Sequence, residues 1–176
     1  MLRLNVGSGT DKRSDFINMD YNSLYNPEVI HNMDSIPWPF EDNTFDEILI
    51  QHVIEHTHNP LLWVQEMWRI SKPGAKIVIK CPHWSTHWAY GDLTHFSQFS
   101  SRSFSHFNLD EIYYNVPARF KVHTELHCLN PRGRFWAKAI NFFMNPLLNF
   151  SFSLTENALC KIFPVYENQY TLEVCK

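Results

Sequence analysis

Short segments in which apolar and polar residues alternate recur along the chain, and this period of two is typical of β-strands. The first segment, residues 2–6, runs directly into Gly7-Ser8-Gly9, which predicts a tight turn. From residue 61 to 70 the apolar positions recur at mostly three- and four-residue spacing and end at Lys72-Pro73-Gly74, which predicts a helix. Together these patterns predict seven strands, at residues 2–6, 16–20, 28–33, 45–50, 76–81, 120–129 and 169–175, and a further helix at 103–114.

The order of these elements indicates the fold class. The strands follow one another early in the chain and then alternate with helices, which predicts an α/β fold with a mainly parallel sheet. With 176 residues the chain has the length of one domain. No internal repeat, low-complexity run or linker divides it, so we expect a single domain over residues 1–176.

The first three predicted strands are joined by connections too short for helices. About seven residues lie in each connection, whereas parallel neighbours usually need a crossover of a dozen or more. Parallel sheets are normally covered on both faces, so we expect reduced helices on one face and an apolar surface that needs another cover.

An aromatic-rich segment between the last two strands, residues 130–168, is the predicted cover. We expect it to be a helical insert, with a helix from Phe135 to Leu154 that packs on the bare face of the sheet or against a second copy in a homodimer. A lid or a membrane-surface element are alternatives. Asparagines and Pro146 interrupt its apolar runs, so we expect no transmembrane segment.

Composition narrows the classes of partner. The net charge of −3 gives no bulk attraction to nucleic acid or anionic membranes. The four cysteines are widely spaced without a CxxC pair, and no segment has the features of a signal peptide. We therefore expect a reducing, cytoplasmic location.

Two carboxylates and a glycine turn stand at the ends of predicted strands. Glycines in Gly7-Ser8-Gly9 let the backbone approach a ligand closely. Asp20 closes the second predicted strand, where a carboxylate can accept both hydroxyls of a ribose. Asp34 closes the third.

Residues 2–82 resemble the class I S-adenosylmethionine-dependent methyltransferases, in particular their type 11 group. The matching motifs are, in order, Gly7-Ser8-Gly9, Asp20, Asp34, Pro39-Phe40-Glu41-Asp42-Asn43-Thr44-Phe45-Asp46, His52-Val53-Ile54-Glu55-His56 and Glu66-Met67-Trp68-Arg69-Ile70-Ser71-Lys72-Pro73-Gly74. The resemblance implies a Rossmann-like, seven-stranded, mostly parallel sheet, S-adenosyl-L-methionine as cofactor, and methyl transfer to a small-molecule or metabolite-type acceptor.

The resemblance also implies roles for individual residues. The loop of Gly7, Ser8 and Gly9 would pass under the methionine part of the cofactor, and Asp20 would hold the ribose. Asp34 would accept a hydrogen bond from the adenine amino group, and Ser35 would offer a backbone N–H. Gln51, after the fourth strand, would face the methionyl or sulfonium end. These seven residues form the predicted cofactor site.

The loop after the fifth predicted strand, residues 82–96, is dense in histidines and aromatic residues. It lies at the carboxyl edge of the sheet, where open α/β folds place ligands, and long loops in compact domains are often functional. We therefore expect an acceptor pocket here. The candidates for a residue that takes a proton are His52, His83, His87 and His95. The alternative is a packed lid whose histidines only satisfy backbone groups.

Two other kinds of function are compatible with parts of the sequence. His52-x-x-Glu55-His56 also matches an inverted zinc-protease pattern, and His83, His87 and His95 could form a metal site, but no distinct third ligand accompanies the first pattern and we expect no metal. In a different class, a degenerate methyltransferase could bind the cofactor and act as a partner or regulatory subunit. Asp11, where many relatives have a third glycine, favours that alternative. Nucleic-acid methylation is not expected, since the net charge is negative and no Asn-Pro-Pro-Tyr/Phe-like string follows the fourth strand.

Overall fold

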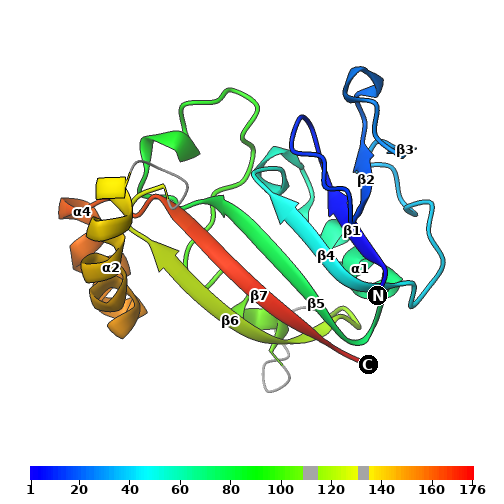
Figure 1. The fold of residues 1–176 in the computed structure, drawn as a ribbon. Helices are drawn as coiled ribbons and strands as arrows, with labels where there is room; N and C mark the ends of the chain where they lie inside the picture. The colour runs from blue at the N-terminus through cyan, green and yellow to red at the C-terminus, as the bar shows by residue number, and fades with distance from the viewer. Residues whose placement is uncertain (109–114, 131–134) are drawn as a thin grey trace.

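A seven-stranded sheet forms the centre of the computed structural model, which describes residues 1–108, 115–130 and 135–176 (Figure 1). Its strands have the order β3-β2-β1-β4-β5-β7-β6. Their bounds are β1 (Arg3–Val6), β2 (Ile17–Asp20), β3 (Val29–Ile30), β4 (Phe45–Gln51), β5 (Ser71–Pro82), β6 (Arg119–His127) and β7 (Glu167–Cys175). Only β7 is antiparallel to its neighbours, β5 and β6. The predicted seven-stranded, mostly parallel Rossmann-like sheet is confirmed.

Helix α1 (Pro60–Ile70) follows β4 and matches the helix predicted from periodicity. Asn59 caps it by accepting a hydrogen bond from the Leu62 N–H, and proline occupies its first position, as favourable helix starts require. The helix predicted at residues 103–114 is described only as a 3₁₀ turn (Ser105–Phe107), and residues 109–114 lie outside the described part of the chain. The other 3₁₀ turns are Ser23–Tyr25, Ile54–His56 and His87–Ala89.

One face of the sheet carries the main hydrophobic core. Helix α1 covers it behind β4 and β5 (Figure 1). The segment that follows β5 packs on the same core, where the Phe104 ring lies 4.5 Å from the Tyr170 ring of β7 and Phe107 contacts Phe120 of β6. Among the described residues, the core is thus closed by α1 and by the aromatic segment that contains Phe104 and Phe107.

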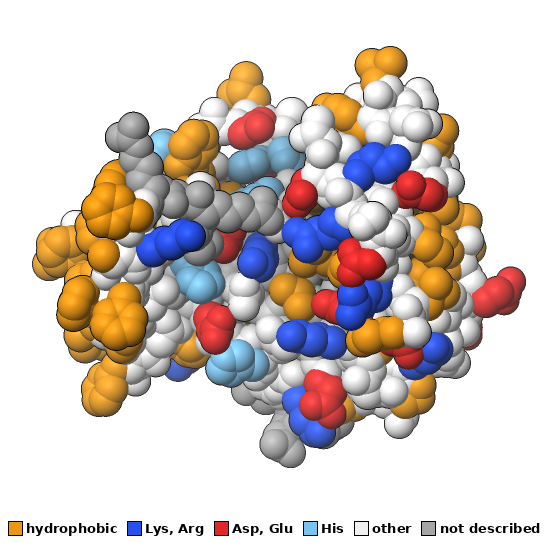
Figure 2. All heavy atoms as spheres, viewed as in Figure 1, with side chains coloured by type: hydrophobic (Ala, Val, Ile, Leu, Met, Phe, Trp, Pro, Cys, Tyr) orange, Lys and Arg blue, Asp and Glu red, His pale blue; other side chains and the backbone are white. Residues whose placement is uncertain are grey.

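The opposite face is polar, which corrects the expectation of a bare apolar surface. In β5 the side chains alternate between the two faces. Ile77 and Ile79 are fully buried on the core side, whereas Lys76 is exposed and Lys80 is half-buried on the other side. Lys121 of β6 pairs with Glu173 of β7 across this face at 2.7 Å. Figure 2 shows Lys, Arg, Asp, Glu and His side chains spread over it. Because the strands alternate apolar and polar residues, this face can meet water and needs no helical cover.

The insert between β6 and β7 contains α2 (Phe135–Phe150), α3 (Phe152–Leu154), a π-helical turn (Thr155–Leu159) and α4 (Cys160–Ile162). It lies at the end of the sheet beside β6, far from β1–β3 (Figure 1). The expectation that it covers the face of the first strands is therefore wrong. A small second core joins it to the sheet through Leu126, Cys128, Leu148, Cys160 and Val165.

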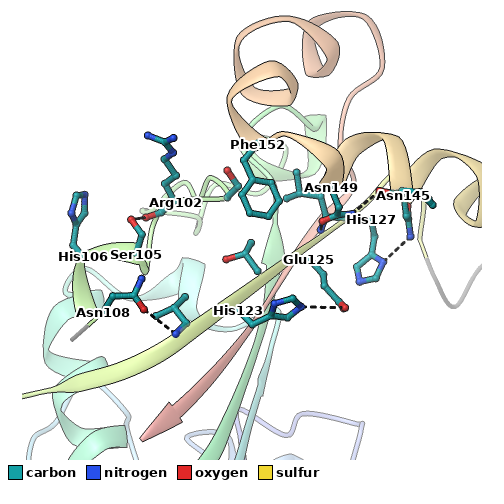
Figure 3. A pocket seen from close by; sticks show the side chains of 15 residues that line it. Arg102, Ser105, His106, Asn108, His123, Glu125, His127, Asn145, Asn149 and Phe152 are labelled. Carbon is teal, nitrogen blue, oxygen red and sulfur yellow. Dashed lines mark hydrogen bonds and ion pairs between the residues drawn. The ribbon is translucent and has the colours of Figure 1, made fainter. Parts of the chain in front are cut away.

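Three asparagines of α2, spaced four residues apart, hydrogen-bond the free edge of the sheet. Asn149 accepts from the Leu126 N–H at 2.8 Å and donates to the Leu126 carbonyl at 2.9 Å. Asn145 accepts from the Cys128 N–H, and Asn141 bonds both backbone groups of Leu129. Figure 3 shows Asn145 and Asn149 reaching from the helix to the strand. The asparagines that interrupt the apolar runs thus cap an edge strand, which would otherwise offer unpaired backbone groups.

The outer surface of α2 is apolar. Phe135 and Phe150 are each 85 % exposed, and Phe142 and Phe143 are each 75 % exposed. Figure 2 shows hydrophobic side chains gathered at the end of the molecule where Figure 1 places α2. A homodimer through this surface stays a prediction. Among the described residues, no helix has the length and apolar character needed to cross a membrane.

Candidate functional site

Four segments meet at the carboxyl edge of the sheet. The parallel strands β1, β2, β4 and β5 all end there, so the glycine turn, Asp20, His52 and the loop after β5 come to one side of the molecule. Strand β7 runs the other way, so its first residue, Glu167, reaches the same edge. In open α/β folds this edge holds the ligand.

The glycine turn is tightly packed on one side and open on the other. Gly7 and Gly9 have φ values of +66° and +46°, in the left-handed region that favours glycine. A Cβ atom on Gly7 would lie 2.5 Å from the methyl groups of Val53, whereas nothing lies within 4 Å of one on Gly9. A side chain at position 7 would therefore collide with Val53, whereas the space beside Gly9 is free for a ligand to approach the backbone.

The Asp20 carboxylate retains acceptor capacity beside this turn. It is 4 % exposed, and its two oxygens accept one backbone N–H each, from Gly9 at 2.8 Å and from Asn22 at 2.9 Å. A carboxylate offers about four acceptor positions, so about two remain for the hydroxyls of a ribose. The buried Ser8 hydroxyl has no hydrogen-bond partner among the described residues. These residues fit a polar ligand such as the nucleoside of the expected cofactor.

The adenine end is built differently from the expectation. Strand β3 is only two residues long, so Asp34 follows it at a distance of four residues. Its Oδ1 accepts from the Thr57 hydroxyl at 2.6 Å and from the Trp63 indole at 2.9 Å. The Ser35 N–H already donates to the Asn32 carbonyl, so the expected donation from Ser35 to adenine is not available in this conformation. Gln51 is the last residue of β4 rather than the first after it, and its contact with the methionyl or sulfonium end of the cofactor stays a prediction.

A cavity of about 790 Å³ opens between the ends of β4 and β5, and we call it the acceptor cavity. It is lined by His52, Glu55, His56, Pro82, His87, Trp88, Gly91, Asp92, Leu93, His95 and Tyr166. Three of the four histidines proposed from the sequence therefore share one cavity. The loop after β5 supplies most of the wall.

His83 lies outside the acceptor cavity. Its ring is fully buried, with Nδ1 2.8 Å from the Ser85 hydroxyl and Nε2 3.3 Å from Glu156 of the insert. Since both nitrogens face protein groups and no solvent reaches them, His83 joins the loop to the insert. Its candidacy as a proton acceptor is corrected on this ground.

His52 is held between two buried carboxylates. Its φ of +53° is unusual for a non-glycine residue. Its Nε2 donates to Glu167 at 2.9 Å, and its Nδ1 lies 3.7 Å from Glu55. Burial lowers the pKa of His52, but the hydrogen bond to Glu167 and the neighbouring Glu55 carboxylate outweigh it and raise this pKa to about 9. The ring is therefore protonated at neutral pH and is a poor proton acceptor there.

Glu167 and Tyr166 are site residues that sequence reasoning missed. Glu167 begins β7 and contacts His52, and Tyr166 directly precedes Glu167 and lines the acceptor cavity. The available signal was the direction of β7, because an antiparallel final strand returns its first residue to the carboxyl edge. The local sequence around Glu167 has no motif that marks it.

Comparison with known proteins gives the same fold. Residues 4–79 match the family model described as "Methyltransferase domain". A S-adenosylmethionine-dependent methyltransferase from Archaeoglobus fulgidus superposes with a TM-score of 0.60 at 17 % identity, covering 97 % of this chain and 85 % of that chain. A putative methyltransferase from Bacillus halodurans gives a TM-score of 0.54 at 13 % identity, covering 98 % and 90 %.

A further similar structure is a complex of the Haloferax volcanii Trm112 methyltransferase activator with a putative methyltransferase, with a TM-score of 0.60 at 11 % identity, covering 99 % of this chain and 83 % of that chain. No curated protein sequence matches the chain significantly. At these identities the structural likeness shows the fold, while the family model covers the part of the chain that carries the glycine turn, Asp20 and Asp34. Residues 4–79 therefore resemble a methyltransferase domain in sequence, and the chain as a whole has the fold of S-adenosylmethionine-dependent methyltransferases.

Proposed function

We propose that this chain is an S-adenosylmethionine-dependent methyltransferase that acts on a small-molecule acceptor bound in the acceptor cavity. The main support for this proposal is the size of the cavity. Its volume of about 790 Å³ lies within the roughly 300–1,000 Å³ common for small-molecule sites. It combines aromatic walls with a few convergent polar groups, as such sites do. The net charge of −3 disfavours a nucleic-acid acceptor.

The cofactor residues are proposed to be the glycine turn, Asp20, Asp34 and Gln51. When bound, S-adenosylmethionine supplies a methyl group that its sulfonium has already activated. The chain's own task is therefore mainly to bind and orient. Asp20 is suited to hold ribose hydroxyls through its remaining acceptor positions, and the open side of Gly9 admits the ligand.

On the acceptor side, Trp88 and Tyr166 provide apolar surface, and His87 and His95 provide ring nitrogens within the cavity. An acceptor that must lose a proton needs a group that takes it. His87, which is exposed at the cavity mouth, and His95 are the proposed candidates. Protonated His52 is proposed to orient the acceptor as a hydrogen-bond donor and positive charge.

The test uses cofactor with an isotopically labelled methyl group. A cell extract is separated into metabolites and macromolecules, and label is followed into each fraction. We expect transfer into the metabolite fraction, with loss of transfer in Trp88→Ala and His95→Ala. His123→Ala is the matched control, since His123 lies in a second cavity, of about 920 Å³, along β6 (Figure 3). Label found only in macromolecules, or loss of transfer in the control alone, would contradict the proposal.

The second candidate is a cofactor-binding subunit that works with a partner. It is motivated by Asp11 in place of a third glycine and by the Haloferax structure, in which a putative methyltransferase is bound to an activator. Cofactor binding without transfer into either fraction would favour this candidate over the first.

A further inference from the structure

Two imidazoles and a carboxylate converge on one side of the acceptor cavity. Glu55 and His56 belong to the 3₁₀ turn after β4, and His95 belongs to the loop after β5. One nitrogen or oxygen atom from each of these three side chains lies within 4.8 Å of the other two. The sequence shows only the Glu-His pair, and the fold supplies the third member.

His56 is oriented so that one ring nitrogen stays available. Thr94 donates its hydroxyl proton to Asp92 at 2.6 Å, so toward His56 the Thr94 oxygens can only accept. The His56 Nδ1 lies 2.9 Å from the Thr94 hydroxyl and 3.2 Å from the Thr94 carbonyl. The proton of the neutral ring is therefore on Nδ1, and Nε2 keeps a free lone pair. This arrangement is the one that outer hydrogen bonds impose on metal-binding histidines.

Glu55 and His95 carry polar atoms that lack partners. Glu55 is 2 % exposed, and its Oε2 is buried without a hydrogen bond among the described residues. The Nδ1 of His95 is likewise buried and unpartnered within the described chain. The Nε2 of His95 lies 3.9 Å from Glu55 Oε1, too far for a hydrogen bond.

We propose that Glu55, His56 and His95 bind a divalent transition-metal ion. Two imidazoles and a carboxylate with one open position form a donor set found for catalytic zinc, and the same set suits other first-row metals. With bonds of about 2.0–2.2 Å in a tetrahedral site, ligand atoms lie about 3.3–3.6 Å apart, so atoms at the 4.8 Å limit would draw together by about 1.2–1.5 Å. All three residues line the acceptor cavity, so the ion would border the space proposed for the acceptor.

This inference rests on the proposed function for its role, and it assigns His95 to the metal ion, so that His87 is left as the candidate proton acceptor. An ion there would hold an acceptor that carries an oxygen donor, such as a hydroxyl or carboxylate, and would set its orientation. The proposal therefore narrows the acceptor to small molecules able to ligate a metal.

The test measures Co²⁺ and Zn²⁺ binding to the full chain after treatment with a chelator. We expect one Co²⁺ per chain, with visible absorption bands of a low-coordination site that Zn²⁺ displaces. His56→Ala and His95→Ala should weaken binding by more than about 100-fold. Thr94→Val, which removes the hydroxyl that bonds both His56 and Asp92 but no ligand, should weaken it by about 10- to 100-fold. His87→Ala, a histidine of the same cavity outside the cluster, should keep wild-type metal affinity.

Several outcomes would overturn the site. They are no stoichiometric metal in the wild type, binding that survives both His56→Ala and His95→Ala, or equal loss in His87→Ala. Calorimetry with S-adenosylmethionine on the same proteins separates this result from the proposed function. Cofactor binding retained by His95→Ala while Co²⁺ is lost supports the metal site and shows that the variant is folded. Metal binding by a wild type that transfers no methyl group would instead leave the site standing and refute the proposed function.

Discussion

Removing one of the asparagines that join α2 to β6 should lower the free energy of unfolding. In Asn149→Ala, Leu126 loses the partners of its backbone N–H and C=O, which bond the asparagine side chain at 2.8 and 2.9 Å. The donation of Asn149 to the Asn145 carbonyl at 2.7 Å is lost as well. Because Leu126 is fully buried, water cannot readily replace these bonds.

A hydrogen bond contributes about 0.5–1.5 kcal/mol net, and a buried group left unsatisfied costs about 1–3 kcal/mol. Leaving the two backbone groups of Leu126 unsatisfied should therefore lower the free energy of unfolding by about 3 kcal/mol. For a domain of this size each kcal/mol shifts the Tm by about 2–4 °C, so we expect a fall of about 6–12 °C. The freed edge of β6 should also raise the tendency to aggregate.

Urea unfolding and calorimetry measure this effect. The matched control is Asn157→Ala, since Asn157 is an exposed asparagine of the same insert that bonds only Ser153 in the described chain. Its free energy of unfolding should change by less than about 0.5 kcal/mol. Equal shifts in the two variants, with unchanged m-values, would show that α2 does not stabilise the sheet through its asparagines.

Two further predictions concern the loop after β5 and the glycine turn. Burial raises the pKa of Glu156, but hydrogen bonds from His83, Trp84 and a backbone N–H outweigh it and lower this pKa to about 2. The folded pKa is below the ordinary value of 4.5, so the stabilisation is complete above pH 4.5 and is lost as pH falls toward 2. The wild type should therefore lose more stability over that range than Glu156→Gln. Parallel acid-unfolding curves for the two proteins would contradict this. In Gly7→Ala, left-handed strain of about 1–2 kcal/mol adds to the contact with Val53 at 2.5 Å, so adding Val53→Ala should restore part of the lost Tm, and no restoration would refute the packing explanation.

The strands and α1 were predictable because each is encoded by local periodicity and punctuation. Lys72-Pro73-Gly74 marks the end of the helix pattern, although the structure begins β5 immediately at Ser71. The length of the third strand was overestimated. Of the residues from Glu28 to Met33, only Val29 and Ile30 pair with β2, and the rest do not form a strand.

The faces of the sheet were harder to predict. The short connections correctly indicated that no α-helices lie between β1, β2 and β3. The inference that the uncovered face of the sheet would be apolar was wrong. The alternation in Lys76-Ile77-Val78-Ile79-Lys80 already places lysines on one face. The position of the insert depends on side-chain to backbone hydrogen bonds between distant segments, and no local pattern reports those.

At the site, the motifs placed Asp20 and the glycine turn at the correct edge because both stand next to strand ends. The partnership of Glu55 with His95, and of His52 with Glu167, spans 40 and 115 residues and follows only from the topology. The histidine content pointed to the loop but could not separate buried His83 from the cavity histidines.

The turn after β1 and Asp20 are proposed to hold S-adenosylmethionine, and calorimetric titration with the cofactor measures this binding. The wild type should bind, and Asp20→Asn should bind at least about tenfold more weakly, because a charge-assisted hydrogen bond contributes about 1.5–3 kcal/mol. Asp15→Asn is the matched control, since Asp15 is an exposed carboxylate paired with Arg3, and it should keep wild-type affinity. Absence of binding in the wild type, or equal affinity in the wild type and Asp20→Asn, would contradict the account.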